Sequence, residues 1–254
     1  MISGSDDTTS DAILGGRLTL RQPAKGHRAG SDAVLAAAAV PAEAGELVAD
    51  FGAGVGTIGL AVLLRVPEAR ALLIEVDAAT AALAEENAAA NGLTERARVL
   101  TGHVARIGTS ETSALAGTVD HVVSNPPFNP SGGRRPPDEA TARARVAPDD
   151  LLDVWTRAAA RLIKPGGSVT FIHRPDALAP ILNALDGRFG GISLRFVHAF
   201  AGAEAVRLLV QARKGNRAPL RVLPPLVLNR EEGGFTLEAE ALHRDLAPLA
   251  MGGK

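Results

Sequence analysis

Short apolar runs alternate with longer segments of helical periodicity over most of the chain. From residue 46 onward, "ELVAD" predicts a strand and "VGTIGLAVLLR" a helix, and the order then repeats. Further strands are expected over "ALLIE", "ARVLT", "VDHVVS", "SVTFIH", "ISLRFVHA" and "AVRLLVQAR". Further helices are expected over "AATAALAEENAAANG", stopped by Gly92, over "DLLDVWTRAAARLI" and over "ALAPILNALDG". This alternation indicates a parallel sheet that helices cover on both faces.

The last two expected strands are joined only by the short link "FAGAE", which permits an antiparallel pair at one edge. We therefore predict an α/β fold with a seven-stranded, mostly parallel sheet and an antiparallel edge strand. Before the sheet, we expect a short strand or hairpin near residues 18–20 and a helix capped by Ser31. The expected organisation is a disordered tail (1–12), an N-terminal extension (13–45), a main domain (46–243) and a C-terminal tail (244–254).

Composition narrows the possible functions. The 254 residues carry a formal net charge of −1, so no overall field draws the protein to nucleic acid or membrane. The chain has no cysteine, which excludes disulfides, thiolate metal sites and cysteine nucleophiles. Its six histidines are scattered without metal-ligand spacing, so we expect no metal. The polar start "MISGSDDTTSD" is unlike a signal peptide, and "AVLAAAAVPA" is too short to span a bilayer. We expect a cytoplasmic protein.

A glycine loop follows the first strand of the main domain. In "VADFGAGVG", Gly52, Gly54 and Gly56 have the spacing G-x-G-x-G rather than the dinucleotide spacing G-x-G-x-x-G. Asp50 lies two residues before the first glycine, where it would repel a pyrophosphate but attract an amino group or a sulfonium. Glu75 ends the next strand, a position from which acids accept hydrogen bonds from ribose hydroxyls. The plainer alternatives are a tight turn and a solvated carboxylate.

A second motif, Asn125-Pro126-Pro127-Phe128, follows the strand "VDHVV". Two consecutive prolines remove two backbone donors and end a strand, so the bland interpretation is a strand terminator beside a core phenylalanine. Together with the glycine loop and Glu75, however, the motif resembles class I S-adenosylmethionine-dependent methyltransferases of the NPPF/NPPY small-domain type, which have a Rossmann-like fold.

The resemblance implies roles for individual residues. The methionine part of S-adenosylmethionine would lie against the loop, and the ribose against the end of the second strand. The implied cofactor contacts there are Asp50, Phe51, Gly52, Ala53, Gly54, Gly56, Glu75 and Val76. His103 stands where many relatives place an acid that contacts adenine; a surface histidine is the alternative. His173 and Arg174 end the fifth strand and either reach the site or serve structure.

The same resemblance implies amino-group methylation. The side-chain oxygen of Asn125 and the carbonyl of Pro126 can each accept one N–H of a substrate amine, whose lone pair then points at the sulfonium methyl. Prolines stiffen the turn, and Phe128 offers a flat face for a base. The motif serves adenine N6, guanine N2 and glutamine N5 methyltransferases alike, so it does not select among these acceptors.

The N-terminal segment "KGHRAGSDAVLAAAA" and the C-terminal part of the chain are further similar to bacterial tRNA(Val) adenine-N6-methyltransferases, over roughly residues 14–243. On that pattern Lys25, Arg28, Ser31 and Asp32 face the cofactor pocket, Asn125 contacts both cofactor and substrate, and Phe128 binds substrate. A solvated loop that caps a helix is the alternative for the N-terminal group. Arginines gather in the extension and in the insertion 129–150; they are Arg17, Arg21, Arg134, Arg135, Arg143 and Arg145.

These arginines would neutralise RNA phosphates, with Arg134 and Arg135 binding substrate, or they simply belong to a solvated, arginine-rich surface. The expected function is methyl transfer from S-adenosylmethionine to a nucleobase amino group in RNA, with adenine N6 of tRNA as the first candidate. The alternatives are N5-methylation of a protein glutamine, guanine-N2 methylation of ribosomal RNA, and a cofactor-binding protein without turnover.

Overall fold

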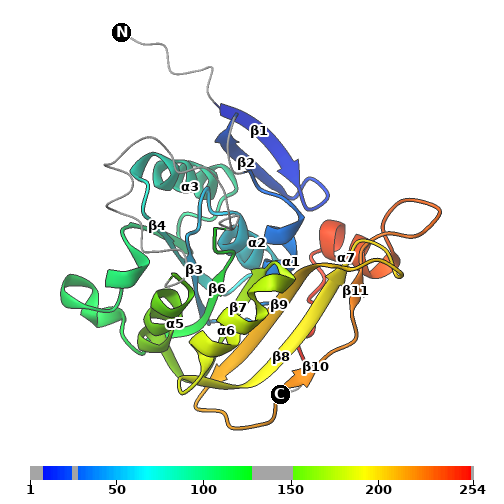
Figure 1. Ribbon diagram of the computed structural model, residues 1–254. Coiled ribbons are helices and arrows are strands. Elements are labelled where there is room, and N and C mark those ends of the chain that lie inside the picture. The colour runs from blue at the N-terminus through cyan, green and yellow to red at the C-terminus, as the bar shows by residue number, and fades with distance from the viewer. Residues whose placement is uncertain (1–7, 25–27, 128–150, 253–254) are drawn as a thin grey trace, which may run out of the picture.

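A computed structural model describes residues 8–24, 28–127 and 151–252, and its centre is one twisted sheet (Figure 1). The strand order is β10-β8-β9-β7-β6-β3-β4-β5, with β11 pairing to β8. The strands are β3 (Leu47–Phe51), β4 (Arg70–Glu75), β5 (Ala97–Thr101), β6 (Val119–Ser124), β7 (Ile163–His173), β8 (Phe189–His198), β9 (Ala205–Lys214), β10 (Arg221–Val222) and β11 (Leu226–Val227). The predicted α/β, Rossmann-like fold is confirmed.

The antiparallel pair lies at the predicted end of the sheet. Strand β9 pairs antiparallel with both β7 and β8, so β8 runs in the same direction as β7. The strand of opposite direction is therefore the second of the seven long strands, not the outermost one. The short strands β10 and β11 add to the far side of β8, with Arg221 opposite Ser193 and Leu226 opposite Val197.

Helices cover both faces because successive strand residues point to opposite sides. On β3, Val48 packs in the cluster with α1 (Ser31–Ala39), α2 (Thr57–Arg65), α3 (Ala78–Ala90) and α7 (Leu237–Asp245). Its neighbour Ala49 packs in the cluster with α5 (Leu151–Leu162) and α6 (Leu178–Leu185). Short 3-10 turns are η1 (Val104–Arg106), η2 (Ser110–Leu115) and η4 (Pro175–Ala177). Throughout the described ranges, no helix combines the length and apolar content needed to cross a membrane.

The N-terminal extension is larger than predicted. Residues 8–12, expected in a disordered tail, belong to β1 (Thr8–Ile13), which pairs antiparallel with β2 (Leu18–Pro23). The polar composition misled the prediction, because the polar groups are used internally. Asp11 Oδ2 accepts hydrogen bonds from Gln22 Nε2 at 2.8 Å and from Arg28 Nη2 at 2.6 Å. On β2, alternate side chains such as Leu18 are fully buried.

The C-terminal end of α3 and the N-terminal end of α1 were both predicted from single residues of the sequence. Gly92 follows the C-cap of α3 with φ of 68°, as the sequence predicts. Ser31, by contrast, is not the N-cap of α1: Gly30 holds that position, and the Ser31 hydroxyl lies 2.6 Å from His243 Nε2 on α7. The expected C-terminal tail also packs against this region, where the Leu249 N–H donates to the Ala38 carbonyl at 2.8 Å.

Candidate active site

The predicted site residues lie side by side at the carboxyl ends of adjacent strands. In the parallel pairing, Phe51 on β3 lies opposite Ile74 on β4 and opposite Ser124 on β6. The next residues, Gly52, Glu75 and Asn125, therefore emerge together at the carboxyl ends of three adjacent strands. Crevices at this edge of an open α/β sheet are the usual place for ligands.

The glycine loop after β3 requires its glycines for different reasons. Gly52, Gly54 and Gly56 have φ of 66°, 57° and 90°, which other residues rarely adopt. A Cβ on Gly52 would lie 2.8 Å from Cη2 of Trp155, whereas a Cβ on Gly54 would meet no heavy atom within 4 Å among the described residues. Gly54 is thus the bare point of the loop, where a ligand can approach the backbone.

Asp50 is a buried carboxylate with one unpaired oxygen. Its Oδ2 accepts the Gly59 N–H at 3.0 Å, while Oδ1 has no hydrogen-bond partner in the described part of the chain. Burial raises the pKa of Asp50 to about 7; the Gly59 N–H opposes this rise and the nearby Glu75 adds to it. A cation or N–H donor delivered to Oδ1 would stabilise the charged form.

Glu75 is held at the end of β4 by three backbone N–H groups. Its Oε2 accepts from Gly54 at 2.9 Å, and its Oε1 accepts from Val76 at 2.9 Å and from Asp77 at 3.0 Å. The carboxylate therefore links the bare point of the glycine loop to the start of α3. Val76 beside it is 55% exposed, so the adjoining surface is open.

Asn125 repeats the pattern seen at Asp50. The side-chain oxygen of Asn125 is buried and has no partner among the residues described. The preceding Ser124 is fully buried and satisfied, because its hydroxyl donates to the Phe51 carbonyl at 3.0 Å. Pro126 is buried and Pro127 is exposed. Phe128, Lys25, Arg134, Arg135, Arg143 and Arg145 lie outside the described residues.

Two other predicted cofactor residues, Arg28 and Asp32, already have protein partners. The Arg28 guanidinium pairs with Asp11 at 2.6 Å, and Asp32 Oδ2 accepts from Arg207 Nε at 2.7 Å. His103 caps η1, two residues beyond the end of β5, and is half-buried. His173 ends β7, where burial lowers its pKa. The structure therefore groups Asp50, the glycine loop, Glu75 and Asn125, while the cofactor roles of these residues and of the peripheral ones stay predictions.

Trp155 is a residue of this site that the sequence did not reveal. It lies on α5, packs edge-to-face on Phe51 with ring centroids 6.4 Å apart, and covers Gly52. It is the only tryptophan of the chain. A residue type that occurs once in a chain draws attention to its position. Nothing in the sequence around α5, however, indicates a contact with a loop about a hundred residues earlier.

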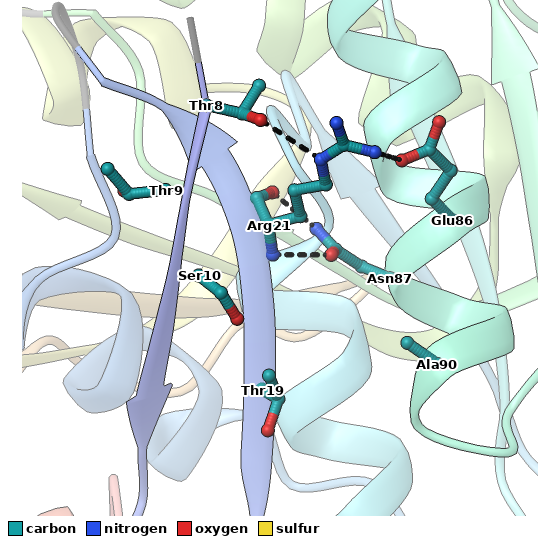
Figure 2. A pocket seen from close by; sticks show the side chains of 8 residues that line it. All are labelled: Thr8, Thr9, Ser10, Thr19, Arg21, Glu86, Asn87 and Ala90. Atoms are coloured by element: carbon teal, nitrogen blue, oxygen red, sulfur yellow. Dashed lines mark hydrogen bonds and ion pairs between the residues drawn. The ribbon is translucent and has the colours of Figure 1, made fainter. Parts of the chain in front are cut away.

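A cavity of roughly 340 Å³ lies elsewhere, between the N-terminal hairpin and α3 (Figure 2). Its lining residues are Thr8, Thr9, Ser10, Thr19, Arg21, Glu86, Asn87 and Ala90. None of the predicted catalytic or cofactor-binding residues lines it, so we do not assign it to the site at the strand ends. In the described ranges, no three His, Asp or Glu side chains gather closely enough to hold a metal ion.

Known proteins share both sequence and fold with this chain. The family model of the methyltransferase small domain matches residues 27–192. A curated relative, the 4-amino-L-phenylalanine/4-methylamino-L-phenylalanine methyltransferase of Streptomyces pristinaespiralis, is 37% identical over 163 residues. That match covers 59% of this chain and 51% of the relative, so the chain spans about half the length of this curated protein.

Solved structures extend the similarity. A predicted O-methyltransferase from Agrobacterium tumefaciens is 30% identical with a TM-score of 0.73, and the match covers 86% of this chain and 98% of that one. The 16S rRNA N2 methyltransferase RsmC from T. thermophilus, in complex with AdoMet and guanosine, has a TM-score of 0.55 at 22% identity over 82% of this chain and 50% of its own. The latter likeness shows the fold alone. With well over half of its length matched by the family model, the chain belongs to the methyltransferase small domain family.

Proposed function

We propose that this protein transfers a methyl group from S-adenosylmethionine to an amino nitrogen attached to an aromatic ring, with adenine N6 of tRNA as the first candidate acceptor. One observation carries the proposal: Asp50 Oδ1 and Asn125 Oδ1 are buried acceptors without partners in the described chain, at neighbouring strand ends. Buried polar atoms are normally paired, so two such atoms at one edge indicate groups that a ligand supplies.

The residues present fit S-adenosylmethionine. When bound, this cofactor supplies an electrophilic methyl group on a positively charged sulfur. Asp50 would hold the cationic methionine part, since its free oxygen is buried and its charge is otherwise uncompensated. Gly54 leaves room for close approach of a ligand to the backbone, and Glu75, at the end of β4, would accept ribose hydroxyls. A neighbouring structure of the same fold, RsmC, contains AdoMet.

Asn125 and Pro126 would act on the acceptor amine. The lone pair of an aromatic amine is delocalised into the ring, so the nitrogen is a weak nucleophile. The Asn125 oxygen and the Pro126 carbonyl would accept its two N–H groups and leave the lone pair free. The methyl group would come from the bound cofactor, whose sulfur would become a neutral thioether, and the methylated nitrogen would release its proton to water. Positioning and electrostatics supply the catalysis, so no strong base is required.

Two acceptor classes have specific support. For RNA, the arginines of the N-terminal extension and the insertion would neutralise phosphates, although Arg21 and Arg28 also pair with Glu86 and Asp11. For a free arylamine, the support is the Streptomyces relative, whose name concerns 4-amino-L-phenylalanine. That amine is conjugated to a ring, as adenine N6 is. The name of the Agrobacterium protein refers instead to an oxygen acceptor.

Labelled methyl transfer separates these functions. The protein is incubated with methyl-labelled S-adenosylmethionine and, in separate tubes, tRNA, ribosomal RNA, total protein and 4-amino-L-phenylalanine. We expect label in tRNA, recovered as N6-methyladenosine after digestion. Label in the free amino acid alone would replace RNA by an arylamine acceptor, and label only in protein would indicate glutamine. Cofactor binding without transfer to any acceptor would leave a non-catalytic binding protein.

A further inference from the structure

The side-chain amide of Asn87 on α3 bonds to the backbone of strand β2, as a neighbouring strand would. Its Oδ1 accepts the Arg21 N–H at 2.7 Å, and its Nδ2 donates to the Arg21 carbonyl at 2.9 Å. Figure 2 shows this pair of bonds between the helix and the strand. The side chain is 1% exposed, so these bonds are made away from solvent. The N-terminal hairpin is thereby fixed to α3 by a side-chain amide.

The same amide also reaches the glycine loop. The second N–H of Asn87 Nδ2 donates to the Val55 carbonyl at 2.9 Å. The adjoining Gly56 N–H donates to the Ala53 carbonyl at 2.9 Å, so the peptide between Val55 and Gly56 is held at both ends. Val55 lies between the left-handed residues Gly54 and Gly56, whose conformations shape the loop. Without the Asn87 bond, only the Gly56 N–H would hold this peptide.

We propose that Asn87 is a positioning residue for the cofactor: it fixes the glycine loop and couples the N-terminal hairpin to it. This inference rests on the proposed function, because it assumes that S-adenosylmethionine binds at Gly54. The buried amide uses both of its N–H donors and one acceptor position of its oxygen, with one bond to the loop and two to the hairpin. Movement of the hairpin would therefore alter the loop conformation through a single side chain.

Asn91 provides a matched control one helical turn away. Its Oδ1 accepts the Thr19 N–H at 3.0 Å and its Nδ2 donates to the Thr19 carbonyl at 2.7 Å. The second donor contact of Asn91 is to the Asn87 carbonyl of its own helix at 2.7 Å. Both asparagines therefore dock the hairpin in the same way, and Asn87 is the one that also contacts the loop.

The test compares Asn87→Asp with Asn91→Asp in the full chain. Each substitution replaces an N–H donor by an oxygen that faces a carbonyl, but only the first disturbs Val55. We measure the Kd of S-adenosylmethionine by fluorescence of Trp155, which covers Gly52, and by equilibrium dialysis with labelled cofactor. The Kd should rise about tenfold for Asn87→Asp and less than twofold for Asn91→Asp. The KM of the amine acceptor and kcat at saturating cofactor should be retained.

Equal changes in Kd for both variants would overturn the inference, since docking of the hairpin would then explain them. An unchanged Kd for Asn87→Asp would do the same. If the buried carboxylate prevents folding, as judged by circular dichroism, Asn87→Ala and Asn91→Ala replace the pair with the same expected ratio. Failure of the unsubstituted protein to bind S-adenosylmethionine would overturn the proposed function, and the inference with it.

Discussion

Polar groups at the two ends of the same parallel strands differ in whether they have hydrogen-bond partners. At the amino-terminal side, His121 on β6 bridges Ser168 and Glu46, with its Nδ1 2.8 Å from the Ser168 hydroxyl and its Nε2 2.9 Å from Glu46 Oε2. Beside it, Asp120 accepts from Lys164 Nζ at 2.7 Å. These groups satisfy one another within the protein, so this end stabilises the fold.

At the carboxyl-terminal side, the buried oxygens Asp50 Oδ1 and Asn125 Oδ1 have no partner in the part of the chain that is described. An unpaired buried polar atom costs free energy, and such a cost is typical of functional sites rather than of structural ones. The contrast teaches that pairing, rather than the mere presence of polar residues, distinguishes the proposed functional end of the sheet from the structural end.

Removal of the Asn125 side chain should have the largest effect on activity and so tests the comparison of the two ends most directly. Asn125→Ala should lower kcat about 100- to 1000-fold, because the acceptor proposed to position the amine is lost. Stability should change little, since the deleted oxygen has no partner in the described structure. Initial rates of methyl transfer and thermal unfolding measure the two effects. In the adjacent control Ser124→Ala, whose hydroxyl is bonded to Phe51, stability should fall instead; full activity of Asn125→Ala would contradict the proposed clamp.

Asp50→Asn should separate stability from binding. Because its pKa is raised from 3.8 to about 7, the folded state holds the proton more tightly, and Asp50 destabilises the fold increasingly as pH rises from 4 to 7. Without ligand, the variant should be more stable by ~2–4 kcal/mol at pH 8, a gain that vanishes toward pH 4. Its affinity for S-adenosylmethionine should fall about 10- to 100-fold.

Urea unfolding across pH and cofactor titration measure these effects, with Asp120→Asn as the control of opposite sign. Burial alone would raise the pKa of Asp120, but the Leu47 N–H and Lys164 outweigh it and hold that pKa below its usual value. Asp120 therefore stabilises the fold at neutral pH, and its replacement should lower stability. A loss of stability at pH 8 in Asp50→Asn would refute our account of this carboxylate.

His121→Ala should affect stability alone, and so has the smallest expected effect on function. It leaves the buried Ser168 hydroxyl without its histidine partner and opens a cavity, at a cost of about 2–4 kcal/mol in the free energy of unfolding. Chemical denaturation measures this loss. The cofactor Kd and the rate per folded molecule should match those of the unsubstituted protein; a tenfold change in either would show that the two ends of the sheet are coupled.

The parallel core was predictable because its signals are local. Apolar runs predict strands, and the carboxyl ends of parallel strands meet at one edge. Asp50, Glu75 and Asn125 each follow such a run, so their convergence could be expected without coordinates. It was harder to predict that β9 lies between β7 and β8. A short link predicts an antiparallel pair but does not say which of the two strands lies farther from the centre of the sheet.

The contacts that were missed join distant parts of the chain. The Ser31 hydroxyl was assigned to its own helix, yet it bonds His243, 212 positions away. Asn87 bonds Arg21 across 66 positions, and its asparagine in an alanine-rich helix gave no indication of that partner. Strand β1 was likewise hidden, because the polar side chain of Asp11 is typical of a tail until its partners Gln22 and Arg28 are known.

The short strands β10 and β11 have a consequence for assembly. They occupy backbone positions of β8 at Ser193–Leu194 and Val197–His198, which covers one border of the sheet. Among the described strands, β5 at the opposite border has a single neighbour, β4. A dimer with a continuous sheet running through both subunits would therefore find its longer free strand at β5, which has five residues against two each in β10 and β11.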